Sequence, residues 1–153
     1  MSVFSFPERV NEYAARLVAT VVASSVVSAF VLKLPWVLPV LALGFVLRVA
    51  WGPRFSPLAR LAMATAPRLW KPKPVAGPPK RFAQGIGALC TLGATASFAL
   101  GYAALGWGLA LLVAFFATLE ASLAFCMGCW LYAQLQRAGL IAPDSCAACV
   151  EGD

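Results

Sequence analysis

The chain has 153 residues, of which 61% are hydrophobic and only 12% charged, with a net charge of +6. Soluble domains carry about 25% charged residues, and disordered chains combine low hydrophobicity with high net charge. Both classes are therefore excluded, and the composition predicts an integral membrane protein. The sequence contains no histidine, which excludes catalysis or metal binding through imidazole. The side chains with evident chemical reactivity are five cysteines: Cys90, Cys126, Cys129, Cys146 and Cys149.

Apolar runs between charged residues predict four membrane-spanning helices, because a span needs about 20 mostly apolar residues. The predicted spans are residues 14–32, 34–51, 82–103 and 107–132. Lys33 and Pro35 separate the first two. The uncharged stretch 82–119 is too long for one crossing, and its glycine-rich segment 101–108 supplies a turn. The expected fold is all-α, an integral membrane four-helix bundle built from two transmembrane hairpins.

The segment between the hairpins, residues 52–81, is strongly basic. It contains seven Lys and Arg residues and no acidic residue. The positive-inside rule therefore predicts that this linker, the tail 133–153 and both termini are cytoplasmic. Ser56 and Pro57 predict the start of a short amphipathic helix that ends near Pro67, and the proline-rich stretch 71–80 predicts an extended strap. We expect the linker to contact anionic lipid rather than nucleic acid.

Three stretches and the leader Val10–Arg16 carry a resemblance to a known family. The stretches are Gly52–Arg60, Pro78–Gly87 and Leu119–Tyr132, which includes the sequence Cys-Met-Gly-Cys. Together they resemble the bacterial membrane family called domain of unknown function 4395. The resemblance implies a small multi-helix protein of the bacterial inner membrane with no settled activity. Relatives in this family occur near genes for thioredoxin-like and sulfurtransferase proteins, so the resemblance also favours thiol or sulfur chemistry.

The cysteines form two Cys-x-x-Cys pairs, Cys126 with Cys129 and Cys146 with Cys149. Three interpretations stay open. The cysteines are small buried apolar residues, or they are redox pairs, since dithiols with this spacing exchange disulfides. Alternatively, the four thiolates hold zinc or another thiophilic ion, because the spacing between the pairs falls within the range of zinc sites. The redox interpretation requires no cofactor.

The predicted position of the first pair argues partly against redox chemistry. Cys126 and Cys129 would lie near the C-terminus of the fourth span, where the helix dipole and the low dielectric both disfavour a thiolate. The tail pair, Cys146 and Cys149, would then meet the soluble partner. Cys90 is a weaker candidate, expected at a depth similar to that of Cys126 in the neighbouring helix.

Glu120 is the other candidate site residue. Its expected position near the middle of the fourth span makes it a functional candidate, because ionisable residues are expensive there. The simpler interpretation is a protonated side chain that hydrogen-bonds to Ser25, Ser28 or Thr95.

The leading functional hypothesis is a membrane component of a thiol–disulfide or sulfur-handling system, with a cytoplasmic thioredoxin-like or sulfurtransferase partner. The alternative is a non-catalytic membrane protein whose cysteines hold a metal or are merely buried. The sequence decides neither whether the protein is an enzyme nor whether it forms a homo-oligomer.

Overall fold

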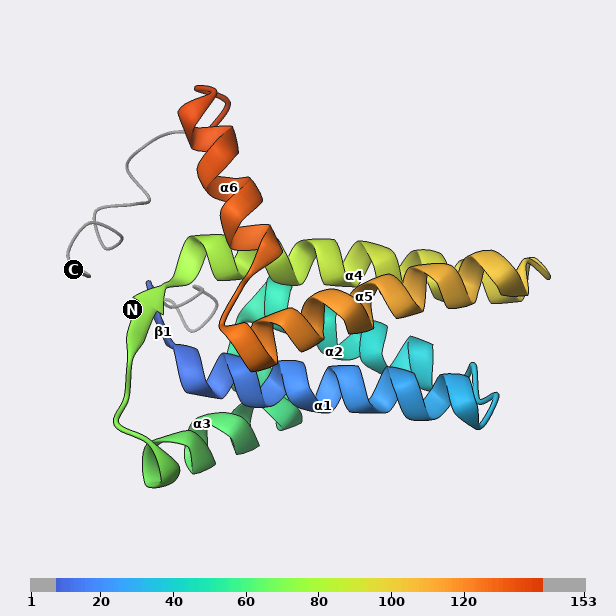
Figure 1. The fold of residues 1–153 in the computed structure, drawn as a ribbon, viewed down its shortest axis with the longest axis horizontal. Helices are drawn as coiled ribbons and strands as arrows, with labels where there is room; N and C mark the ends of the chain where they lie inside the picture. The colour runs from blue at the N-terminus through green and yellow to red at the C-terminus, as the bar shows by residue number, and fades with distance from the viewer. Residues whose placement is uncertain (1–7, 142–153) are drawn as a thin grey trace.

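The computed structural model describes residues 8–141, which form an almost entirely helical fold (Figure 1). In chain order the elements are β1 (Arg9–Asn11), α1 (Glu12–Val31), α2 (Val37–Trp51), the 3-10 helix η1 (Pro53–Phe55), α3 (Pro57–Leu69), β2 (Pro74–Ala76), α4 (Gly77–Ala99), α5 (Ala103–Leu123) and α6 (Met127–Arg137). The long helices α1, α4 and α5 run lengthwise beside the tilted α2. Both hairpin turns lie at one end, and α3, the strands and the base of α6 lie towards the other.

The helices have the composition expected of a membrane protein. Within the described residues, α1, α4 and α5 are long and apolar enough to cross a membrane, whereas α2 is apolar but shorter. Its 15 residues extend over about 22 Å at 1.5 Å per residue, less than the roughly 30 Å of bilayer hydrocarbon. The predicted all-helical class is confirmed, and three of the described helices have the length and composition of membrane spans, whereas the predicted bundle of four spanning helices is not shown by these lengths.

Large apolar side chains cover the outside of the bundle. Val31 is 68% exposed, Leu43 59% and Leu89 73%, on three different helices. In water, large exposed apolar side chains in such numbers would favour aggregation. The arrangement fits a protein whose long helices face lipid.

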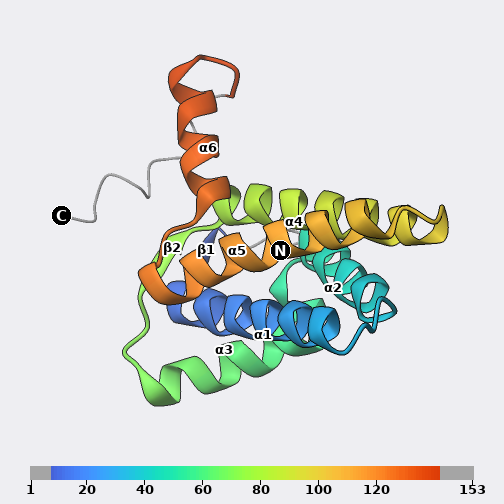
Figure 2. The same ribbon diagram turned by 45° about the vertical axis from the view of Figure 1, so that its right-hand side comes forward.

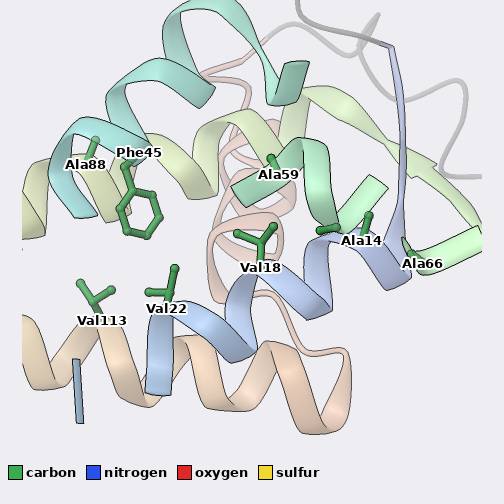
Figure 3. Packing of buried hydrophobic residues seen from close by; sticks show 9 residues of the cluster. Ala14, Val18, Val22, Phe45, Ala59, Ala66, Ala88 and Val113 are labelled. Atoms are coloured by element: carbon green, nitrogen blue, oxygen red, sulfur yellow. The ribbon is translucent and has the colours of Figure 1, made fainter. Parts of the chain in front are cut away.

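The interior is packed mainly by small residues. The main core cluster joins five helices, with Val18 and Val22 from α1 facing Phe45 from α2 and Val113 from α5 (Figure 3). Alanines fill most of the remaining buried positions, such as Ala88 on α4. Helices in lipid associate through close van der Waals packing, which small residues permit. Helix α1 packs on α5 and α3, while α4 packs on α2, α5 and α6.

The short helix predicted in the linker is present as α3, directly after Ser56. It packs on α1 through Ala59, Ala62 and Ala66, while Leu61 is 63% exposed. The prediction ended this helix near Pro67, but it continues to Leu69. Pro67 removes one backbone donor close to the C-terminus, where little of the helix remains to be disrupted.

The prediction of an extended strap over residues 71–80 was correct only in its first part. β2 pairs antiparallel with β1, with Val10 opposite Val75, and Lys73 forms a 3.0 Å ion pair with Glu12. From Gly77 onward the chain is helical, so the third long helix starts before residue 82. Proline is tolerated in the first helical turn because the backbone N–H groups there have no partner within the helix.

Candidate functional site

The last long helix of the predicted bundle is divided in two. Helix α5 ends at Leu123 and α6 begins at Met127, so the expected continuous span over 107–132 is wrong. Figure 2 shows α6 standing away from the long helices at the end of the bundle near β2. This break moves Cys126 and Cys129 from the expected C-terminus of a buried helix to the N-terminus of a separate one.

Contacts from distant parts of the chain hold the break in place. Ala124 adopts a left-handed conformation, with φ 56°, and its N–H bonds to the carbonyl of Leu119. The guanidinium of Arg16 on α1 donates hydrogen bonds to the carbonyl oxygen of Ala121, at 3.0 Å and 2.8 Å, and to that of Ser122 at 3.1 Å. A cation is favourable beside helix C-terminal carbonyls. Arg16 therefore caps the C-terminus of α5.

Cys126 is the N-cap residue of α6, and it forms a disulfide with Cys129. The two Cα atoms are 5.2 Å apart, and Cys126 Sγ accepts a hydrogen bond from the Cys129 N–H at 3.2 Å. A helix N-terminus stabilises a negative charge, including that of a thiolate. The sequence-based objection to redox chemistry assumed a helix C-terminus, and that assumption is wrong.

Gly128, between the two cysteines, sets how closely α6 approaches α4. A Cβ atom added at Gly128 would lie 2.5 Å from both Cα and Cβ of Ala83, closer than atoms can pack. One turn further along α6, the Tyr132 ring packs against that of Phe82, with centroids 5.7 Å apart. These contacts therefore hold the disulfide-bearing turn of α6 against the N-terminal part of α4.

Glu120, one turn before the end of α5, forms an ion pair with Lys80 in the first turn of α4. Both side chains are largely buried, with relative exposures of 15% and 10%. The expected partners were Ser25, Ser28 and Thr95, so the prediction for Glu120 was wrong in its partner. The cause is the early start of α4, which moves Lys80 from the predicted strap onto a helix facing α5.

Arg48 forms a charged cluster together with the Glu120–Lys80 ion pair. It is only 4% exposed, and its Nε donates to Gln84 Oε1 at 2.8 Å. Its guanidinium also lies 4.5 Å from the centroid of the Phe45 ring, and its charge interacts with that of Glu120. Arg48 points into the bundle, where Gln84 and Glu120 provide polar partners.

Two hollows meet at Cys126. The inner cavity, of about 210 Å³, lies between α4, α5 and α6, and its walls include Gln84, Cys90, Glu120 and Cys126. The outer recess, of about 360 Å³, lies beside the strand β2, and its walls include Lys80, Cys126, Cys129 and Trp130. The disulfide thus separates an apolar cavity within the bundle from a recess at its end.

Comparison with known proteins agrees with the resemblance seen in the sequence. Residues 10–137 match the model of the family described as domain of unknown function DUF4395. The chain belongs to this family. No curated protein and no solved structure shows a significant match to it. The chemistry of this DUF4395 chain is therefore inferred from its own residues.

The other predicted site residues of the DUF4395 protein lie in different places. Cys90 is a free, partly buried cysteine on α4 and lines the inner cavity together with Cys126. Cys146 and Cys149 lie outside the described residues. Within residues 8–141, no group of three or more Cys, Asp or Glu side chains could hold a metal ion. The four-thiolate zinc site of the sequence analysis would need the tail pair in addition to Cys126 and Cys129.

Sequence reasoning identified the cysteines and Glu120 but missed Arg16, Lys80, Arg48 and Gln84 as parts of the site. The sequence did contain one signal for the separate helix α6. Beyond Cys126 the uniformly apolar sequence gives way to mixed polar and apolar residues, with Gln134, Gln136 and Arg137. This change favours an amphipathic helix over a continued span.

Proposed function

We propose that this DUF4395 protein is a membrane thiol–disulfide exchange protein, with Cys126 and Cys129 as its exchanging pair and a soluble thioredoxin-like protein as its partner. The observation that carries this proposal is the position of the pair at the N-terminus of α6, outside the long apolar helices. Dithiols with this spacing at a helix N-terminus are the usual unit of disulfide exchange, because the helix stabilises the attacking thiolate.

The charges around the pair support the proposal. Lys80 lines the outer recess together with both cysteines, and cations nearby favour a thiolate. Glu120 partly balances this charge, but Arg48 also points into the cluster. The described cluster of two cations and one carboxylate therefore carries a net positive charge when all three are ionised, and it suits an anionic sulfur.

The outer recess suits a polypeptide partner. Phe125 and Trp130, on its walls, are 39% and 50% exposed, and exposed aromatic residues beside a reactive group are typical of protein contact sites. A partner thiolate attacks Cys129, and the Cys126 sulfur leaves as a thiolate. The second partner thiol then attacks the mixed disulfide. The partner leaves oxidised, and Cys126 and Cys129 are left as two thiols.

The membrane arrangement is part of the proposal. The base of α6 lies at the same end of the bundle as α3, and the disulfide is at this end of α6. We propose that the chain crosses a bacterial inner membrane four times, with α2 as the second arm of the first hairpin. We also propose that this end of the bundle and both termini are cytoplasmic.

A thiol titration tests the proposal. The variant Cys146→Ser/Cys149→Ser is purified, reduced and incubated with a glutathione redox buffer, and its free thiols are counted by mass after alkylation. We expect the reversible loss of two thiols as the buffer becomes more oxidising, with Cys90 alkylated throughout. Adding Cys126→Ser should abolish the paired loss. Two thiols that never pair under any buffer would overturn the proposal. Bound zinc with four shielded thiols in the unsubstituted protein would favour the metal site instead.

A further inference from the structure

The inner cavity has the size and the chemistry of a binding site for one six-membered ring. Its volume is about 210 Å³, and an apolar protein cavity of about 150 Å³ is sufficient to bind benzene. Phe45, Leu112 and Phe116 contribute apolar walls. An apolar cavity of this size favours an apolar ligand over water, because water needs polar partners.

The cavity is placed for entry from the lipid phase. Most of its walls come from α4 and α5, which are long and apolar enough to cross a membrane. Two of its wall residues, Leu112 and Leu131, are 44% and 37% exposed on the outside of the bundle. A ligand that reaches the cavity between them has to be soluble in lipid.

Polar groups stand at defined points of this apolar wall. Gln84 Oε1 accepts a hydrogen bond from Arg48, so the Gln84 amide nitrogen is the group that can donate to a ligand. Glu120 lines the inner cavity, and its ion-pair partner Lys80 lines the outer recess. Cys126 lines both hollows, whereas Cys129 lines the outer recess. A ring in the inner cavity therefore has one sulfur of the redox pair on its wall.

We propose, on the basis of the exchange function above, that the inner cavity binds a lipid-soluble quinone that reoxidises the Cys126–Cys129 dithiol. Quinones are known to reoxidise protein dithiols in bacterial membranes. The two S–H bonds break and one S–S bond forms. The quinone ring takes the two electrons, and its two carbonyl oxygens take the two protons and become hydroxyls. Glu120 and Lys80 provide the route for protons, and Gln84 donates to a quinone carbonyl.

The experiment follows quinone reduction by the reduced protein. The Cys146→Ser/Cys149→Ser protein is reduced, freed of reductant under anaerobic conditions, and mixed in detergent with a short-chain benzoquinone whose ring positions are all substituted. Full substitution prevents the thiols from adding covalently to the ring. We expect one quinol to form for every two thiols lost, and peptide mapping to assign the new disulfide to Cys126 and Cys129.

Two further variants locate the site. Ala117 lines the inner cavity, whereas Ala104 is exposed on the same helix α5. Ala117→Phe fills the cavity and should slow quinol formation about 100-fold or more, since misplacing reacting groups by an ångström already has an effect of this size. Ala104→Phe adds the same side chain away from the cavity and should react like the parent.

The outcomes separate this proposal from the exchange function. If the dithiol equilibrates with glutathione but no quinol forms, the quinone site is wrong and the exchange function stands. If neither reaction occurs, both are wrong. If quinol forms equally fast with Ala117→Phe, the cavity is not the site. A tightly bound lipid chain that quinone does not displace would assign the cavity to lipid and overturn the proposal.

Discussion

The apolar sequence that follows the basic linker is interrupted twice, and the two interruptions are held by different means. Between α4 and α5 the chain turns at Gly101, which adopts φ 86°. Between α5 and α6 it turns at Ala124, which adopts φ 56° although it carries a Cβ. The first turn reverses the chain into a hairpin, whereas the second redirects it into α6, which carries the disulfide (Figure 2).

The difference lies in what stabilises each turn. At Gly101 the residue type is sufficient: a Cβ there would meet nothing within 4 Å, so glycine is needed only for its backbone conformation. At Ala124 the strained backbone is compensated by partners elsewhere, namely the Arg16 cap on α5 and the contact of Gly128 with Ala83. A break that depends on tertiary contacts places a reactive pair accurately, and it is correspondingly sensitive to substitution of those partners.

The largest expected effect comes from the ion pair beside the second break. Lys80→Met leaves Glu120 without its partner, and breaking a buried pair from one side costs about 3–5 kcal/mol. We expect about 3 kcal/mol, the lower end of this range, because Arg48 still interacts with Glu120. The measurement is the free energy of unfolding in mixed micelles, followed by helical circular dichroism.

The control for this prediction is the double variant Lys80→Met/Glu120→Leu, which removes both charges. It should recover part of the lost stability, since replacing both members of a buried pair with apolar residues is often neutral, whereas Arg48 loses the favourable charge of Glu120 in this variant. If the two substitutions destabilise additively, the pair does not stabilise the contact between α4 and α5.

The second prediction concerns the cap on α5. Arg16→Ala removes the hydrogen bonds to the carbonyls of Ala121 and Ser122, and bonds to a charged group contribute about 1.5–3 kcal/mol. We expect a loss of that size, together with faster amide hydrogen exchange at the end of α5 and the start of α6. Arg60→Ala on α3, where the arginine is exposed, should leave both quantities unchanged. Equal effects of the two variants would contradict the role of Arg16 as a cap.

The same contrast explains what the sequence could and could not predict. The turn at Gly101 was predicted because glycine marks it locally. The break after Leu123 was missed because alanine in a left-handed conformation and cysteine as an N-cap are both unusual, and Arg16 lies 105 positions away from Ala121. Lys80 was assigned to the extended strap and Arg48 was not identified as a site residue, because their partners become visible only when α4 packs against α2 and α5.

The third prediction tests the seat of α6 on α4. Gly128→Ala introduces a Cβ that would lie 2.5 Å from Ala83, so α6 has to move away. Overpacking costs about 1–3 kcal/mol, and a single methyl group should fall in the lower half of that range. We also expect faster alkylation of reduced Cys126 by a water-soluble maleimide. Gly108→Ala on α5, where a Cβ meets nothing within 4 Å, should be neutral or stabilising. Unchanged alkylation at Cys126 would show that the contact does not seat the pair.

The smallest effects come from exchanging the two turn residues, and they should have opposite signs. A left-handed conformation costs an alanine about 1 kcal/mol more than a glycine. Gly101→Ala should therefore destabilise the protein by about 1 kcal/mol, since open space around it offers no compensating contact. Ala124→Gly should relieve strain at the second break and stabilise the protein by up to about 1 kcal/mol, reduced by the greater freedom of glycine in the unfolded chain. Unfolding in mixed micelles measures both. If Ala124→Gly were instead destabilising by more than Gly101→Ala, the Ala124 methyl group would contribute packing that outweighs its backbone strain, and the second break would depend on that side chain as well as on its distant partners.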